Sequence, residues 1–249
     1  MQKLEWWKDF FSGLTVDMWR QAVTEEQTRS EADFIQRMLK LTPPATILDV
    51  PCGFGRLAIE VATRGFTLSG VDISSQFLEE AKAAAKKLQL NVSWYQRDMR
   101  DLPLESSFDG AFCFGNSFGY LDDESNVQFL EAVYRVLRPN GRFILDASSV
   151  AENVLPKIQD HTEMEFGDIR FIEDNHYDHE LSRLDTQYTF VRSDRTEKKF
   201  GSHRIYTYRE LQGLLSSTGF VNCQSFGTIT GEPFAFGANG LYIVATKRA

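Results

Sequence analysis

The chain predicts an α/β fold with a doubly wound, mostly parallel sheet, an antiparallel last strand and a small antiparallel β insertion. Three observations support this prediction. Short apolar segments alternate with amphipathic helical segments from about residue 45 to 147, which is typical of βαβ units in a parallel sheet. From about residue 160 to 200, apolar and polar residues alternate singly, as in half-exposed antiparallel strands. The first pattern then returns and continues to the C-terminus.

The first 27 residues form a polar lead-in whose aromatic residues are Trp6, Trp7, Phe10, Phe11 and Trp19. We interpret this segment as a hydrophobic lid over a ligand site. An amphipathic segment docked on the core and a contact between the two copies of a homodimer are the open alternatives. Residues 30–41 have apolar side chains at helical spacing, and the prolines at positions 43 and 44 end the predicted helix.

The core elements follow in order from the same patterns. An apolar run, Ala45–Val50, predicts a buried strand that ends at Pro51. After the second strand, the helix begins near Ser74, with Ser75 as a candidate cap. The predicted strands are 45–50, 66–72, 92–96, 108–114, 142–147, 220–226 and 241–247, and the predicted helices are 55–64, 74–88, 126–137 and 208–217.

Composition and charge exclude several classes of partner. The formal net charge is −8 and the pI about 5.1, whereas a nucleic-acid-binding protein needs a basic face. We expect the lysines of residues 82–87 on the solvated face of an Ala-rich helix. No apolar run reaches the roughly 18 residues of a membrane span, and the N-terminus does not resemble a signal peptide. The well-separated Cys52, Cys113 and Cys223 predict reduced thiols in a cytoplasmic protein.

A glycine loop, Gly53-Phe54-Gly55, follows the first strand and opens a helix. Glycine lets the backbone approach a ligand closely, and the helix presents free N–H groups. The loop alone does not identify the ligand, because with Ala58 it also matches a dinucleotide-binding fingerprint. Acidic residues at two strand ends narrow the choice of ligand. Asp49 precedes the loop, and Asp72 can accept hydrogen bonds from the ribose hydroxyls of a nucleoside. A helix cap would also account for Asp72.

Two further strand ends extend the predicted site. At the third, the carboxylate of Asp98 can accept from an adenine amino group and the N–H of Met99 can reach the ring, although a polar turn would have the same composition. The fourth strand, 108–114, runs into the polar loop that contains Asn116 and Ser117. Ligands of open α/β sheets bind at the carboxyl ends of the strands, so we expect these loops to line one site.

Together these residues resemble the class I S-adenosylmethionine-dependent methyltransferases, of the small-molecule type. The resemblance covers about residues 40–150 and the two last strands, and it implies a Rossmann-like fold. Pro51 departs from the family pattern, which often has glycine or another small residue there. The five segments that match in order and spacing are Ile47–Gly55, Gly70–Ser74, Gln96–Met99, Phe108–Cys113 and Leu137–Ile144.

The resemblance implies a role for each matching residue. The two glycines of the loop would pass close to the methionine part of S-adenosylmethionine, and Asp49 would order the loop or reach the ammonium group. Asp72 would hold the ribose, while Asp98 and Met99 would frame the adenine. The residues expected at the cofactor are Asp49, Gly53, Gly55, Asp72, Ile73, Asp98, Met99, Phe114 and Trp19.

The acceptor is expected at the loop after the fourth strand and at the junction before the last helix. In related enzymes this loop lies beside the transferable methyl group, although an ordinary Asn/Ser turn would explain its composition equally. His203 and Tyr120 are the candidates for a catalytic role, with an exposed or structural histidine as the alternative. The residues expected near the acceptor are Asn116, Ser117, Tyr120, His203, Arg204 and Tyr206.

The pair His176-x-x-His179 does not predict a metal site. In a strand this odd spacing places the two rings on opposite faces, and in a hairpin turn both rings are solvated. We therefore expect no metal in the reaction.

The sequence thus predicts an enzyme that transfers a methyl group from S-adenosylmethionine to an O or N atom of a small molecule by in-line displacement. The alternatives are an NAD-dependent oxidoreductase and a non-catalytic binding protein with the same fold. We expect a lid at residues 1–27, a core at 28–158 and 207–249, and a β-rich insertion at 159–206 that caps the substrate site. Neither nucleic acid nor a membrane is an expected partner.

Overall fold

The computed structural model describes residues 5–102 and 107–249, so the first four residues of the expected lid lie outside it. It contains a seven-stranded sheet of order β10-β11-β5-β4-β1-β2-β3 and a four-stranded sheet of order β6-β7-β8-β9. Among the described strands of the larger sheet, β11 (Tyr242–Lys247) alone runs antiparallel to its neighbours. The predicted fold class, including the antiparallel last strand and the separate antiparallel insertion, is confirmed.

The larger sheet follows the predicted alternation of strands and helices. Its other strands are β1 (Thr46–Asp49), β2 (Thr67–Asp72), β3 (Val92–Gln96), β4 (Phe108–Cys113), β5 (Leu137–Asp146) and β10 (Phe220–Phe226). The helices beside it are α3 (Glu25–Leu39), α4 (Arg56–Thr63), α5 (Ser75–Lys87), α6 (Asp123–Val136), the short α7 (Ala151–Val154) and α8 (Tyr208–Thr218).

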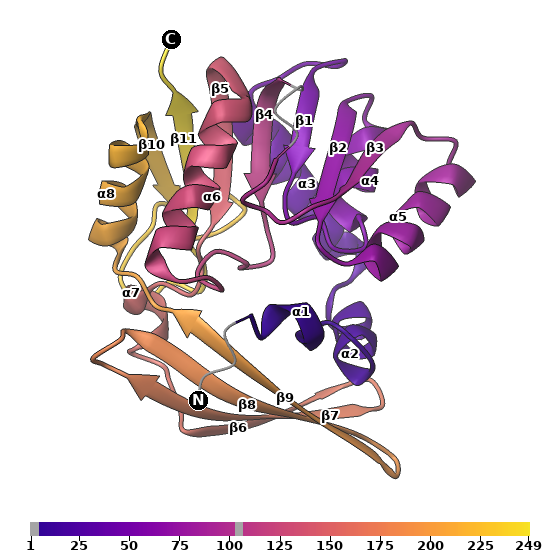
Figure 1. The fold of residues 1–249 in the computed structure, drawn as a ribbon, viewed down its shortest axis with the longest axis vertical. Helices are drawn as coiled ribbons and strands as arrows, with labels where there is room; N and C mark the ends of the chain where they lie inside the picture. The colour runs from indigo at the N-terminus through magenta and orange to yellow at the C-terminus, as the bar shows by residue number, and fades with distance from the viewer. Residues whose placement is uncertain (1–4, 103–106) are drawn as a thin grey trace.

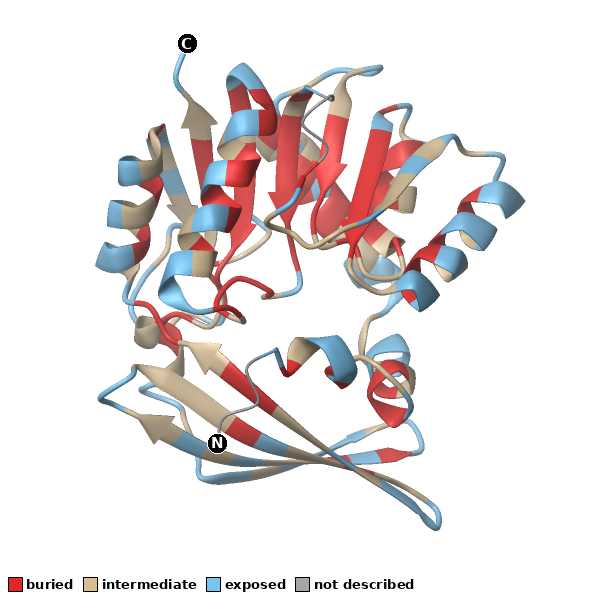
Figure 2. Cartoon of the chain, in the orientation of Figure 1, coloured by how far each residue is buried: buried red, intermediate tan, exposed pale blue. Residues whose placement is uncertain are grey.

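Helices cover both faces of the larger sheet, and the buried residues lie between the layers (Figures 1 and 2). On one face, Phe34 of α3 and Val61 of α4 belong to an apolar cluster with strand residues such as Phe112. On the other face, Phe129 of α6 and Leu215 of α8 belong to a second cluster. Right-handed crossovers place helices in this way on a parallel sheet, which leaves the carboxyl ends of its strands free to bind a ligand.

Several boundaries differ from the prediction, and side-chain caps explain three of the differences. Helix α3 begins at residue 25 rather than 30, because the Thr24 side chain accepts a hydrogen bond from the N–H three residues on. Asp122 caps α6 in the same way, so this helix begins at Asp123, three residues before the predicted start. Ser74, and not Ser75, caps α5. Strand β5 begins at Leu137, five residues earlier than predicted.

The insertion is an antiparallel meander that lies below the carboxyl ends of the larger sheet (Figure 1). Two short helices, α1 (Trp7–Phe10) and α2 (Leu14–Ala22), lie between the two sheets, and the sequence patterns did not indicate them. Leu14 and Met18 of α2 pack against the insertion in an apolar cluster that includes Phe190. The strands of the insertion are β6 (His161–Phe166), β7 (Ile169–Asp178), β8 (Arg183–Arg192) and β9 (Arg195–Arg204).

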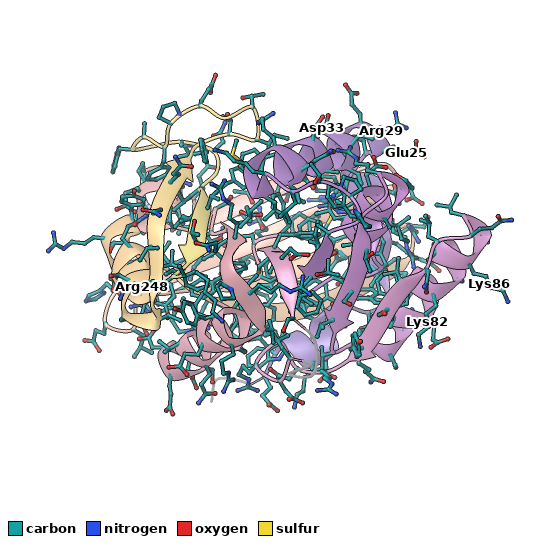
Figure 3. The ribbon with its side chains drawn as sticks, turned by 90° about the horizontal axis from the view of Figure 1, so that it is seen from above. Glu25, Arg29, Asp33, Lys82, Lys86 and Arg248 are labelled. Atoms are coloured by element: carbon teal, nitrogen blue, oxygen red, sulfur yellow. The ribbon has the colours of Figure 1, made fainter. Side chains whose placement is uncertain are left out.

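The outer faces of the helices carry charged side chains. In Figure 3, Glu25, Arg29 and Asp33 follow one another along α3, and Lys82 and Lys86 extend from α5. All five residues are exposed, which confirms that the lysine group lies on a solvated face. Within the described ranges, every helix is too short or too polar to cross a membrane.

Candidate functional site

A cavity of about 210 Å³ lies at the carboxyl ends of β1, β2 and β4, with α1 and α2 on its other side. Most of the residues that the sequence predicted for the cofactor line it together. Those residues are Asp49, Gly53, Asp72, Ile73, Asp98, Met99, Phe114 and Trp19. The sheet topology explains this convergence, because parallel strands end at the same edge.

Two glycines open the backbone of the core toward this cavity. Gly53 after β1 has φ +54° and Gly115 after β4 has φ +82°, and both line the cavity. A Cβ atom added to either residue would meet no atom within 4 Å, so it would occupy the cavity itself. The two glycines therefore form a cradle in which a ligand can approach the main chain.

Gly55 has a different role from the one expected. It does not belong to the cavity lining; it has φ +80° at the start of α4. An added Cβ would lie 2.6 Å from Cη2 of Trp94 and 2.8 Å from Cβ of Ala81. The expectation that Gly55 lies against the cofactor is not supported, since this glycine allows α4 to begin close to β3 and α5.

Asp72 orders the glycine loop. Its Oδ2 accepts a hydrogen bond from the Gly53 N–H at 2.8 Å, and its Oδ1 accepts from the Ser74 N–H at 2.8 Å. Burial raises the pKa of this carboxyl group, while the backbone hydrogen bonds act in the opposite direction. The resemblance implied that Asp49 orders the loop or reaches the ammonium group, and the structure adds a direct contact between Asp72 and the loop.

A buried charge network lies behind the loop. Asp49 is almost fully buried, and burial raises its pKa although Arg56 acts in the opposite direction. Arg56, in the first turn of α4, lines the cavity and its guanidinium lies 2.5 Å from Oε2 of Glu31 on α3. Arg56 was not among the predicted site residues, although a cation directly after the glycine loop is a visible signal in the sequence.

The carboxylate at the end of β3 is held by a neighbouring arginine. Arg100 donates to both oxygens of Asp98, at 2.8 and 2.7 Å, and it also donates to Ser125 Oγ of α6 at 3.1 Å. The hydrogen bonds from Arg100 lower the pKa of Asp98. Asp98 is therefore ionised and fixed beside Met99 at the cavity wall.

Asp146 shapes the loop after β4. This buried residue at the end of β5 accepts hydrogen bonds from the N–H groups of Gly115 and Asn116, both at 3.1 Å, and from Ser148 Oγ at 2.6 Å. The side chain of Asn116 bonds to Ser149 and does not line the cavity. No spacing signal in the sequence marked Asp146, because the two loop N–H groups that it holds lie 31 and 30 residues away.

His203 lies behind this loop rather than in the cavity. Its Nε2 donates to the Asn116 carbonyl at 3.0 Å, and its ring packs edge-on against Tyr120 with 4.8 Å between centroids. Burial lowers the pKa of His203 to about 4, so the ring is neutral at physiological pH. Of the residues expected near the acceptor, Ser117 and Tyr120 line the cavity.

Arg204 and Tyr206 bind the core instead of lining the cavity. Arg204 Nε lies 2.9 Å from an Asp123 carboxylate oxygen, and the Tyr206 hydroxyl donates to the same oxygen at 2.7 Å. Both residues thus fasten the end of β9 to the start of α6, and their placement does not support contact with an acceptor. His176 lies in β7 and His179 in the turn that follows.

Aromatic side chains of the lead-in close the cavity. Trp7, Phe11 and Trp19 line it, and the Phe11 ring lies 6.2 Å from that of Tyr120. Trp6 is buried, and its Nε1 donates to the Ser202 carbonyl of β9 at 3.0 Å. The lead-in therefore packs within one copy of the chain, against both the cavity and the insertion.

Sequence comparisons match this chain to known methyltransferases. Residues 47–141 match the family model described as a methyltransferase domain. A Geobacillus sp. (strain WCH70) protein named as a methyltransferase is 30% identical over 235 residues, covering 86% of this chain and 90% of the relative.

Two solved structures share the fold. An S-adenosylmethionine-dependent methyltransferase from Clostridium acetobutylicum aligns with a TM-score of 0.79 at 17% identity, covering 92% of this chain and 94% of that one. An amino pentose methyltransferase from Micromonospora echinaspora, solved with S-adenosylmethionine bound, aligns with a TM-score of 0.70 at 19% identity, covering 96% and 98%. The chain therefore belongs to the class I S-adenosylmethionine-dependent methyltransferases.

Proposed function

We propose that the chain transfers the methyl group of S-adenosylmethionine to an O or N atom of a small molecule by in-line displacement. The observation that carries this proposal is the single cavity in which two open glycines, Gly53 and Gly115, meet the carboxylates of Asp72 and Asp98. The amino pentose methyltransferase with the same fold acts on a small molecule, which supports the acceptor class.

The residues present fit the cofactor. In the proposal, Asp72 holds the ribose hydroxyls, Asp98 and Met99 hold the adenine, and the glycine cradle leaves room for the methionine part beside Asp49. An ionised carboxylate such as Asp98 accepts a hydrogen bond from an amino group well. When bound, the cofactor supplies a methyl group that is already activated for transfer.

The protein itself must position the cofactor and the acceptor and exclude water from them. Residues 1–27 act as the lid and residues 159–206 cap the acceptor side. Ser117 and Tyr120 face the acceptor, while His203 is neutral and fixes the loop between them. We also propose a cytoplasmic enzyme, in keeping with three free cysteines of which two are buried.

Binding of the demethylated cofactor tests the proposal. Isothermal titration with S-adenosylhomocysteine should give saturable binding in a one-to-one ratio, and titration with NAD should give none. Incubation of the enzyme with S-adenosylmethionine and a panel of small phenols and amines should then release S-adenosylhomocysteine. Binding of NAD in place of S-adenosylhomocysteine would contradict the proposal and favour an oxidoreductase.

A further inference from the structure

The two sides of the cavity carry different chemistry, and from this we infer that the methyl acceptor is a neutral, flat, apolar ring compound. The inference rests on the proposed function and specifies its substrate class.

The acceptor side of the lining has no charged side chain among the described residues. It is formed by α1, by α2 with the residue after it, and by the loop after β4. Ser117 and Tyr120 supply its two hydroxyl groups. Its members are Trp7, Phe11, Val16, Val23, Ser117, Tyr120 and Leu121.

Every charged side chain of the described lining comes from the core side. These residues are Asp49, Arg56, Asp72, Arg97 and Asp98, at the ends of β1, β2 and β3 and in α4. Each already has a partner in the protein: Arg56 pairs with Glu31, and Arg97 lies 3.8 Å from Asp101. Asp49 has a backbone hydrogen bond from Ala58 and feels the charge of Arg56, whereas Asp72 accepts from backbone N–H groups and Asp98 is paired with Arg100.

A charged acceptor would therefore lose water without gaining a counter-ion. Burying an unpaired charge is costly, whereas apolar area removed from water contributes about 25 cal/mol per Å². Flat rings also gain from edge and face contacts with Trp7, Phe11 and Tyr120. The two hydroxyl groups can bond the single polar atom that receives the methyl group.

Three naphthalene probes with the same ring test the inference: neutral 2-naphthol, cationic 2-naphthylmethylamine and anionic 6-hydroxy-2-naphthoate. Each is titrated calorimetrically at pH 7 into the enzyme already saturated with S-adenosylhomocysteine. We expect 2-naphthol to bind about tenfold more tightly than either charged probe. Equal or tighter binding of a charged probe, or no binding of 2-naphthol, overturns the inference.

The prior titration with S-adenosylhomocysteine keeps the two proposals apart. If S-adenosylhomocysteine binds and the neutral probe is not preferred, only the acceptor inference fails. If S-adenosylhomocysteine does not bind, the proposed function fails and the acceptor inference fails with it.

A matched pair of variants adds a second test. Val23 follows α2 and lines the acceptor side half-buried. Val23→Glu should shift the affinity ratio of 2-naphthylmethylamine to 2-naphthol about tenfold toward the amine, relative to the uncharged control Val23→Gln. Titration with S-adenosylhomocysteine verifies that each variant is folded. An identical ratio in the two variants would mean that this position does not face the acceptor, and it would overturn the inference.

Discussion

The core side and the lid side of the cavity are built in different ways. On the core side, charged groups at strand ends are fixed by ion pairs and backbone hydrogen bonds, as for Asp72 and Asp98. On the lid side, aromatic rings such as Trp7 and Phe11 pack without a charge. In the proposed function, recognition of the cofactor therefore depends on the sheet itself, whereas recognition of the acceptor depends on segments added to it.

The attachments of the lid follow the same division. Helix α2 of the proposed lid is tied to the insertion, where Glu197 accepts from the Leu14 N–H at 2.9 Å and Arg192 pairs with Asp17 at 2.8 Å. Its ion pair with the core helices joins Arg20 to Glu80 of α5, and both side chains are partly exposed. The lid and the insertion thus form one unit against the core.

The largest effect expected within the core concerns the two glycines of the loop. Gly55→Ala should lower the free energy of unfolding by about 2–4 kcal/mol, because its Cβ would clash with Trp94 at positive φ. The Cβ added in Gly53→Ala would meet no atom within 4 Å, so this substitution should lower the free energy of unfolding by only about 1 kcal/mol. It should nevertheless weaken S-adenosylhomocysteine binding about tenfold. Urea unfolding and calorimetric titration of both variants measure the contrast. Equal losses of stability in both would refute the division of roles.

The free energy of unfolding should depend on pH through His203, which lies where the insertion meets the core. Its pKa is about 4 in the folded protein, below the ordinary value of 6.5, so between these values the unfolded chain binds more protons. Stability is therefore fully present above pH 6.5 and is lost on acidification toward pH 4, by about 2–3 kcal/mol. Urea unfolding of His203→Gln should lack this part of the pH dependence. A variant with the same slope as the parent chain would show that another group titrates.

On the core side, Asp72→Ala should weaken S-adenosylhomocysteine binding by about 1–3 kcal/mol. The substitution leaves the N–H groups of Gly53 and Ser74 without their acceptor, in addition to removing the proposed ribose contact. Asp72→Asn retains one acceptor oxygen. Its affinity for S-adenosylhomocysteine should lie between those of the parent chain and of Asp72→Ala in the same titration. An affinity unchanged in Asp72→Ala would remove this residue from the site.

The smallest effect is expected where the lid meets the core. Arg20→Ala removes an exposed ion pair with Glu80, which should lower stability by less than about 1 kcal/mol. Because this pair joins the lid to α5, the dissociation rate of S-adenosylhomocysteine should nevertheless rise, and stopped-flow tryptophan fluorescence can measure it. The control is Arg29→Ala, which removes an ion pair within α3. A similar change of rate in both variants would contradict a gating role for the lid.

The sequence was most informative where the signal is local. Strand β3 and strand β10 have the predicted bounds, because their apolar and aromatic residues are interspersed with polar ones between turn residues. The glycine loop and the aspartates at strand ends converge on one cavity because parallel topology brings them there. The choice between S-adenosylmethionine and NAD required the combination of these segments, which no single loop supplies.

The rest depends on contacts between distant residues. Asp146 shapes the site through the N–H groups of Gly115 and Asn116, 31 and 30 residues away, which periodicity does not reveal. The placement of Arg204 and Tyr206 was missed for the same reason, since Asp123 holds both from 81 and 83 residues away. Helices α1 and α2 are short and rely on packing against the insertion, so their own propensity gave little signal.

The hydrogen bond from Trp6 to the Ser202 carbonyl has a consequence for the order of assembly. It closes a loop of 196 residues, whereas the contact between Asp72 and Gly53 spans 19. Long closures cost more chain entropy and form later than short ones, and a growing chain reaches Ser202 long after it has passed the glycine loop. A nascent chain that extends only just beyond α5 already contains the glycine loop and Asp72. It does not yet contain the insertion, so Trp6 has no partner on β9. The order in which the chain emerges thus delays the packing of the lead-in against the insertion. The loop proposed to receive the methyl donor can form early.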